Sequence, residues 1–247
     1  MPDDPILYNS VAPLRNVAAL LELIDRVQTP APSLPGMACF YGPSGYGKTT
    51  AATFAENRYQ AVRIEMRSRW TPRKLCETIS LEMGQTPART VCDMIDAICT
   101  QLAALDVPLL IDEADYLIRH KMVEIARDIY EGSGVPVILI GEELLPQKLT
   151  QWERVHGRML GWTAAEPGDM ADLGHLAGIY AAGIELAEDL RTAILRASGG
   201  SIRRISTNLD AAAAFARASG RSSLSLADWQ GQAFFSGEAP APRRLAS

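Results

Sequence analysis

The sequence has few cysteines, few histidines and no long apolar run, and each shortage excludes a class of protein. Only four of the 247 residues are cysteine and none forms a CxxC pair, which argues against a disulfide scaffold or a cysteine-bound metal. The three histidines are scattered, so a histidine metal site is not expected. No apolar run reaches the roughly 18 residues of a membrane-spanning helix, and the first residues lack the pattern of a secretory signal. These absences predict a cytoplasmic protein with reduced thiols.

The chain also lacks an excess of positive charge, since its formal net charge is −5. A protein that binds nucleic acid with its whole surface is therefore not expected. The cations are instead concentrated in one segment, which contains Arg63, Arg67, Arg69, Trp70, Arg73 and Lys74 and only Glu65 in opposition. Such a segment favours contact with the DNA backbone, with Trp70 stacking on bases or wedging between them. Arg119 and Lys121, predicted to lie on the loop after Asp112-Glu113, would add to the same side. A solvated charged loop is the alternative.

A glycine-rich octet carries the clearest chemical signal. It reads Gly42-Pro43-Ser44-Gly45-Tyr46-Gly47-Lys48-Thr49, and Thr50 follows it. Glycines let backbone N–H groups turn inward around an anion, Lys48 can contact the β- and γ-phosphates of ATP, and the Thr49 hydroxyl can bind Mg²⁺. An apolar stretch over 37–41 precedes the octet, and a helical stretch from 49 onward would face the phosphates. The octet predicts a phosphate-binding loop (P-loop), with a glycine-rich turn without ligand as the alternative.

An acidic pair, Asp112-Glu113, ends the apolar segment 107–111. This is the Walker B pattern, in which Asp112 would hold Mg²⁺ opposite Thr49 and Glu113 would polarise the attacking water as catalytic base. An acidic strand exit without function is the alternative. Asp115 is interpreted as a plain helix cap.

The next apolar segment ends in Ile140-Gly141-Glu142, where this fold usually supplies a polar side chain near the γ-phosphate. No Asn or Thr stands there. Glu142 either substitutes for that residue or caps a helix, so the sensor position stays open.

Apolar segments and helical segments alternate along most of the chain. Strands are predicted over 37–41, 61–66, 107–111, 135–140 and 159–163, and helices over 11–27, 72–83, 90–105, 121–130 and 142–152. This order predicts an α/β fold with a parallel five-stranded sheet sandwiched between helices, and a P-loop at the end of its first strand. The predicted domains are a nucleotide-binding domain over 1–165, a small all-helical lid over 166–236 and a disordered tail over 237–247.

Three arginines are candidates for contact with the γ-phosphate. Arg154 and Arg158 lie just before the fifth predicted strand, where an arginine could complete the ATP site of a neighbouring subunit as a finger. Arg154 is the better placed, and a surface arginine is the alternative for both. Arg203 follows the Ser201 cap of a lid helix and could contact the γ-phosphate of its own subunit, with an exposed helix arginine as the alternative.

These elements together resemble the AAA+ ATPases and, more narrowly, the phage Mu B-type target-capture ATPases and related transposon helper ATPases, over about residues 8–230. The P-loop and Asp112-Glu113 carry the general resemblance. The narrower one depends on the basic segment 67–74, the strand and turn 135–142, the segment 152–155, and 200–204 before an alanine-rich helix.

The resemblance implies that ATP and Mg²⁺ drive self-assembly into a ring or helical filament on double-stranded DNA, without sequence preference, in a bacterial host cytoplasm. The assembly would deliver target DNA to a transposase and activate it, and slow hydrolysis, stimulated by DNA and by oligomerisation, would disassemble it. It also implies that Asn9 and Val11 lie near the adenine.

Two other functions remain open. One is an AAA+ ATPase of the ExeA-like secretion type or of the replication-loader type, which DNA-stimulated turnover would help to separate. The other is a nucleotide-gated scaffold with little hydrolysis, which the absence of a polar residue at the end of strand four leaves possible.

Overall fold

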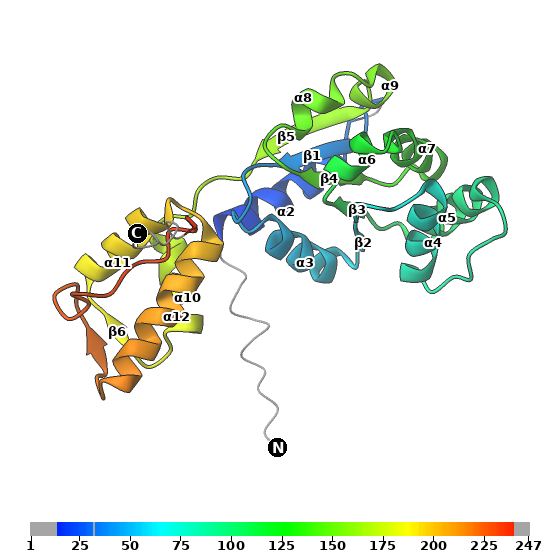
Figure 1. Cartoon of the computed structure of the whole chain (residues 1–247). Helices are drawn as coiled ribbons and strands as arrows, with labels where there is room; N and C mark the ends of the chain where they lie inside the picture. The colour runs from blue at the N-terminus through cyan, green and yellow to red at the C-terminus, as the bar shows by residue number, and fades with distance from the viewer. Residues whose placement is uncertain (1–13, 32, 240–247) are drawn as a thin grey trace, which may run out of the picture. The chain divides into compact units, whose positions relative to one another are not determined.

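The computed structural model describes residues 14–31 and 33–239 (Figure 1). These residues form two compact units, Arg15–Glu166 and a smaller one from Pro167 onward, which are described separately. The predicted boundary after residue 165 lies one residue away. Most of the predicted tail 237–247 lies outside the described residues, as do Asn9, Val11 and the start of the predicted first helix. Within the described ranges, no helix combines the length and apolar character needed to cross a membrane.

The larger unit is built on a five-stranded parallel sheet with the order β2-β3-β4-β1-β5. The strands are β1 (Met37–Tyr41), β2 (Val62–Glu65), β3 (Leu109–Asp112), β4 (Val137–Gly141) and β5 (Met159–Ala164). Because the strands are parallel, all their carboxyl ends lie on one edge of the sheet. The end of β4 therefore lies between the end of β1, where the P-loop begins, and the end of β3, which carries Asp112.

Helices cover both faces of this sheet (Figure 1). On one face pack α2 (Arg15–Gln28) and α3 (Lys48–Tyr59). The other face carries α4 (Pro72–Glu82), α5 (Val91–Leu105), α6 (Asp115–Arg119), α7 (Val123–Ser133), α8 (Leu145–Leu149) and α9 (Glu153–His156). Burial on both faces explains why β1, β3 and β4 read as continuous apolar runs rather than alternating ones.

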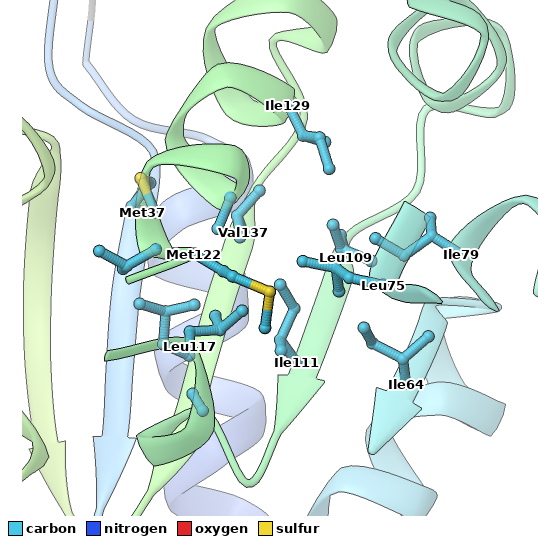
Figure 2. Packing of buried hydrophobic residues seen from close by; sticks show 14 of the residues in the cluster. Met37, Ile64, Leu75, Ile79, Leu109, Ile111, Leu117, Met122, Ile129 and Val137 are labelled. Carbon is cyan, nitrogen blue, oxygen red and sulfur yellow. The ribbon is translucent and has the colours of Figure 1, made fainter. Parts of the chain in front are cut away.

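One apolar cluster fixes the second set of helices to the sheet. Figure 2 shows the strand side chains Met37, Ile64, Leu109, Ile111 and Val137 packed among Leu75, Ile79, Leu117, Met122 and Ile129 of the helices and their connections. All of these residues are at most 2% exposed. Interiors packed in this way hold loops at the strand ends in fixed positions.

Local signals place the ends of several helices. The Thr71 hydroxyl accepts a hydrogen bond from the Lys74 N–H at the start of α4, and Pro72 occupies the first turn, where its missing N–H costs nothing. Gly134 ends α7 in the left-handed conformation. The helix predicted over 142–152 is shorter in the structure. It begins at Leu145, with Pro146 in its first turn, and ends at Leu149, and α9 follows as a separate helix after Trp152.

The smaller unit contains α10 (Met170–Tyr180), α11 (Glu188–Ser198) and α12 (Ile202–Ala218). The Ser201 hydroxyl accepts a hydrogen bond from the Arg204 N–H at the start of α12, as the sequence predicts. The unit is not wholly helical, because β6 (Glu185–Leu186) pairs in parallel with β7 (Ser223–Leu224). Two-residue strands are too short to show an alternating pattern, which is why the sequence did not reveal them.

Candidate functional site

The glycine octet lies between β1 and α3. Gly45 and Gly47 have φ values of 86° and 83°, a region that residues with a Cβ adopt rarely. The loop therefore wraps in front of the N-terminus of α3, where N–H groups of the first turn have no partners within the helix. This geometry is suited to an anion such as a phosphate group.

Lys48 is folded back onto this loop. Its ammonium Nζ lies 2.6 Å from the carbonyl oxygen of Gly42 and 2.9 Å from that of Pro43. Burial lowers the pKa of Lys48, against the opposing effect of four carboxylates. These belong to Asp112, Glu113, Asp115 and Glu142. A lysine that is held by two carbonyl groups and surrounded by carboxylates can exchange the carbonyls for phosphate oxygens without leaving the loop.

Asp112 lies at the carboxyl end of β3 and is only 2% exposed. Its Oδ1 accepts a hydrogen bond from the Glu113 N–H, whereas Oδ2 is buried without a hydrogen-bond partner and lies 4.0 Å from Arg63 Nη1. Burial raises the pKa of Asp112, although the Glu113 N–H and the Thr49 hydroxyl lower it. A buried carboxylate that has one oxygen without a hydrogen bond and lies close to the Thr49 hydroxyl supplies the oxygen ligands that Mg²⁺ prefers.

Glu113 follows in the left-handed region of backbone space, with φ of 54°. Such a conformation is uncommon for a residue with a side chain and often marks a functional position. Burial raises the pKa of Glu113, and the charge of Asp112 raises it further. A half-buried carboxylate with a raised pKa, next to the Asp112 oxygen, has the properties of a general base.

Asp115 is not the plain helix cap that the sequence suggested. Its Oδ2 accepts a hydrogen bond from the backbone N–H of Glu142, and its Oδ1 pairs with the Lys148 ammonium. Asp115 lies two residues after Walker B and therefore ties the start of α6 to the turn after β4. Glu142, which the sequence left as a candidate sensor, contributes its backbone to this contact.

Asn16 is a site residue that the sequence did not single out. Its side-chain amide donates to the carbonyl oxygens of Tyr46, in the P-loop, and of Glu166, and its Oδ1 accepts from the Glu166 N–H. Asn16 is 4% exposed. A buried amide that makes these three hydrogen bonds holds Tyr46 of the P-loop close to Glu166, the last residue of the larger unit. The only available signal was one polar residue within the apolar face of α2.

The basic segment lies on the same edge of the sheet, after β2. Arg67, Arg69, Lys74, Arg119 and Lys121 are all exposed, and none of their side chains forms an ion pair with another described residue. The His120 ring nitrogen Nε2 lies 2.8 Å from the Ser68 carbonyl oxygen. This contact joins the segment after β2 to the end of α6, so these cations form one surface, called here the basic surface. Arg119 ends α6 rather than lying in a loop.

Three residues predicted for this surface have other contacts. Arg63 pairs with Glu56 at 2.6 Å and points toward Asp112, because it lies within β2 rather than after it. Trp70 is half-buried and packs against the apolar cluster, so its ring is not presented for stacking. Arg73 is exposed, but it pairs with Glu77 and donates to the Arg89 carbonyl oxygen. The basic surface therefore depends on the other five cations.

Comparisons with known proteins agree with this geometry. Residues 33–149 match the protein family described as "AAA domain". The chain is similar in fold to the Orc1 protein of Aeropyrum pernix, solved in complex with DNA, with a TM-score of 0.66, 19% identity and 89% of this chain covered. It is similar to Cdc6p from Pyrobaculum aerophilum with a TM-score of 0.63, 16% identity and the same coverage. The fold is that of the AAA+ P-loop ATPases.

The chain spans 64% of the length of the Orc1 chain and 66% of the Cdc6p chain, just under two thirds of each. No curated protein matches it. At these identities the likeness establishes the fold alone and leaves the residues to be judged from their own geometry.

The two candidate finger arginines differ in their surroundings within this AAA+ fold. Arg154 lies on α9, is exposed, and its side chain has no hydrogen bond or ion pair with another described residue. Arg158 instead pairs with the Glu131 carboxylate of α7, at 2.6 Å from Nη2. Arg154 is therefore the one that is free to reach a neighbour. Arg203 lies in the first turn of α12, in the smaller unit, and is exposed.

Within the described ranges, no group of three or more histidine, cysteine, aspartate or glutamate residues forms a metal site of its own. The Mg²⁺ that the AAA+ fold implies would therefore be held by Thr49, Asp112 and the bound nucleotide together. The unpartnered Asp112 oxygen fits that arrangement.

Proposed function

We propose that this chain binds Mg²⁺-ATP between the P-loop and the end of β3, hydrolyses it, and in its ATP-bound state assembles on double-stranded DNA. One observation carries the proposal. The backbone of the basic segment is tied both to Walker B, through the Met66 N–H and the Asp112 carbonyl oxygen at 2.9 Å, and to α6, through His120. A movement of Walker B on nucleotide binding would therefore pass through these hydrogen bonds to the cations that would contact DNA.

Each residue of the nucleotide site has a distinct task in this proposal. The P-loop N–H groups and Lys48 bind the phosphates, and Thr49 and Asp112 hold the metal. Mg²⁺, when bound, neutralises charge on the phosphates. Glu113 orients the attacking water and accepts its proton. Arg154 of one subunit approaches the ATP of the next, so hydrolysis depends on assembly.

Binding through the basic surface would be independent of sequence. Exposed arginine and lysine side chains contact phosphate oxygens, which are the same at every base pair. The net charge of −5 over the whole chain makes this surface the place where a polyanion is attracted rather than repelled. The Orc1 structure similar to this chain contains DNA, which supports a DNA-binding role.

The finer role of this activity is helper to a transposase, as the resemblance to the Mu B-type ATPases suggests: the ATP-bound assembly captures target DNA and activates the transposase. A second candidate is an ATPase of the replication-loader type, which the likeness in fold to Orc1 and Cdc6p favours. The two differ in partner, so addition of a transposase and strand-transfer substrate separates them.

The proposal is tested by ATP turnover with and without random-sequence duplex DNA. We expect wild-type turnover to be slow alone and faster with DNA, and Lys48→Ala to lose nucleotide binding and DNA binding together. Lys74→Ala, which removes a lysine outside the nucleotide site, is the matched control and should bind ATP normally. DNA binding by Lys48→Ala as tight as by the ATP-bound wild type would contradict the proposal. Nucleotide binding without turnover would instead identify a nucleotide-gated scaffold.

A further inference from the structure

Strand β4 ends on Gly141, and the space beside this glycine is already filled. A Cβ at this position would lie 2.4 Å from Asp115 Oδ2 and 2.6 Å from Leu145 Cδ2. A Cβ atom does not approach a non-bonded heavy atom this closely, so any side chain at position 141 would displace the Asp115 carboxylate and the end of the Leu145 side chain. The place where a polar side chain of β4 was expected is therefore taken by the carboxylate of Asp115, the first residue of α6.

Asp115 is held there by two strong contacts. Its Oδ2 lies 2.6 Å from the Glu142 nitrogen, and its Oδ1 lies 2.6 Å from Lys148 Nζ on α8. The Asp115 side chain is 13% exposed and that of Lys148 is 37% exposed. Hydrogen bonds to a charged group in partly buried surroundings are among the stronger polar contacts in proteins.

The last two residues of β4, just before this turn, accept two further backbone hydrogen bonds from residues of the nucleotide site. The Gly141 carbonyl oxygen accepts a hydrogen bond from the N–H of Gly42, the first residue of the P-loop, at 3.3 Å. The Ile140 carbonyl oxygen accepts one from the Ala114 N–H at 2.8 Å. The turn after β4 is therefore where the P-loop, Walker B and α8 meet.

The charge of Asp115 reaches the residues that would bind the phosphates. It opposes the lowering of the Lys48 pKa by burial, and it contributes to the raised pKa of Glu113. A nucleoside triphosphate brings several more negative charges close to the four carboxylates that surround Lys48. The positive charge of Lys148 balances the negative charge of Asp115, and Lys148 lies outside both the P-loop and Walker B.

We propose that Asp115, paired with Lys148, is the positioning residue for the γ-phosphate end of the site, in place of a β4 side chain. The Asp115 carboxylate fixes the Gly141–Glu142 turn against the P-loop and Walker B. Lys148 cancels the charge of Asp115, so that the triphosphate is not repelled. This inference rests on the proposed ATP binding and adds two residues to the site.

The charge half of the inference is tested by Lys148→Met. Removal of the ammonium leaves Asp115 uncompensated, and we expect ATP affinity, measured by calorimetry, to fall roughly tenfold or more, with a smaller loss for ADP. The double variant Asp115→Asn/Lys148→Met is neutral and keeps an acceptor for the Glu142 N–H. It should recover most of the lost affinity. A double variant no better than Lys148→Met would overturn this half.

The positioning half is tested by Asp115→Ala, which should lower kcat more than it raises KM. Gly141→Asn alone should be equally impaired, because its side chain collides with Asp115. The pair Asp115→Ala/Gly141→Asn should exceed both single variants, because the polar group then stands on β4. If the pair is worse than either single variant while all three melt like the wild type without nucleotide, the positioning role is wrong.

The matched control is Asp128→Asn, which removes a carboxylate paired with Arg127 on the exposed side of α7. It should leave ATP affinity, kcat and KM unchanged. A wild type that binds and hydrolyses ATP, with Lys148→Met and Asp115→Ala indistinguishable from it, overturns this inference and leaves the proposed function intact. A wild type without ATP affinity overturns both.

Discussion

The nucleotide site and the basic surface share one edge of one sheet but are built in opposite ways. In the nucleotide site the functional groups are buried or half-buried and lie close to like charges, as Asp112 and Glu113 illustrate, and Glu113 also has a left-handed backbone conformation. In the basic surface the cations are exposed, form no ion pair with any other residue that the structure describes, and are carried on long flexible side chains. The difference follows from the proposed ligands. One phosphate–metal group must be held in a fixed geometry, whereas DNA, a long polyanion, is bound more tightly as the number of nearby cations rises.

An exposed residue that acts on a nucleotide would break this comparison, and Arg154 is the residue that we propose for this role. Because a finger from a neighbour stabilises the charge of the transition state, we expect Arg154→Ala to lower DNA-stimulated kcat roughly 10³-fold. Arg158→Ala, which loses only the Glu131 pair, should retain activity. The measurement is steady-state turnover at saturating ATP and DNA. Equal losses in both variants would show that the segment before β5 matters only for folding.

Within the nucleotide site, Glu113→Gln separates chemistry from binding. We expect kcat to fall roughly 10²- to 10³-fold, because the amide cannot accept a proton, while ATP affinity stays within a factor of three of the wild type. Assemblies on DNA should persist longer, which electron microscopy after ATP addition would reveal. Turnover at the wild-type rate would assign Glu113 another role.

For the basic surface, the expected effect is smaller and depends on salt. The double variant Arg67→Ala/Arg69→Ala should weaken DNA binding roughly tenfold at moderate salt, and the slope of log K against log[salt] should flatten by roughly 0.9 per contact removed. Arg26→Ala/Arg58→Ala removes the same charge from exposed ends of α2 and α3 and should change neither. An unchanged slope in the first variant would remove these arginines from the interface.

The smallest effect on binding is expected for Trp70→Ala. Since Trp70 packs against the apolar cluster, its truncation should lower the free energy of unfolding by about 2 kcal/mol, as measured by urea denaturation. DNA affinity of the folded variant should remain close to that of the wild type. A large loss of affinity with unchanged stability would instead return Trp70 to the stacking role that the sequence suggested.

What the sequence predicted well is what depends on local pattern. The octet between a strand and a helix and the acidic pair after an apolar run led to the AAA+ fold, because their spacing along the chain is their signal. The contacts of Asn16, Asp115 and Arg63 were not predictable in this way. Asn16 meets residues 30 and 150 positions away, and Asp115 meets Lys148 across 33 positions, so only the folded sheet brings them together.

The basic surface shows that the number of cations in a segment does not tell which of them are available to bind DNA. The sequence counts every cation between residues 63 and 74 as available for DNA, but Arg63 and Arg73 form ion pairs with Glu56 and Glu77. Glu56 lies in α3, before the segment, and Glu77 lies one helical turn after Arg73 in α4. A count of cations within the segment leaves out both partners.

The most direct measurement is the affinity of the wild-type chain for random-sequence duplex DNA, by fluorescence anisotropy, with Mg²⁺ and a non-hydrolysable ATP analogue, with Mg²⁺-ADP and without nucleotide. We expect tight binding only with the triphosphate analogue, because occupancy of the site between Lys48 and Asp112 organises the basic surface and the assembly. Equal affinity under all three conditions would contradict the coupling between the two sites.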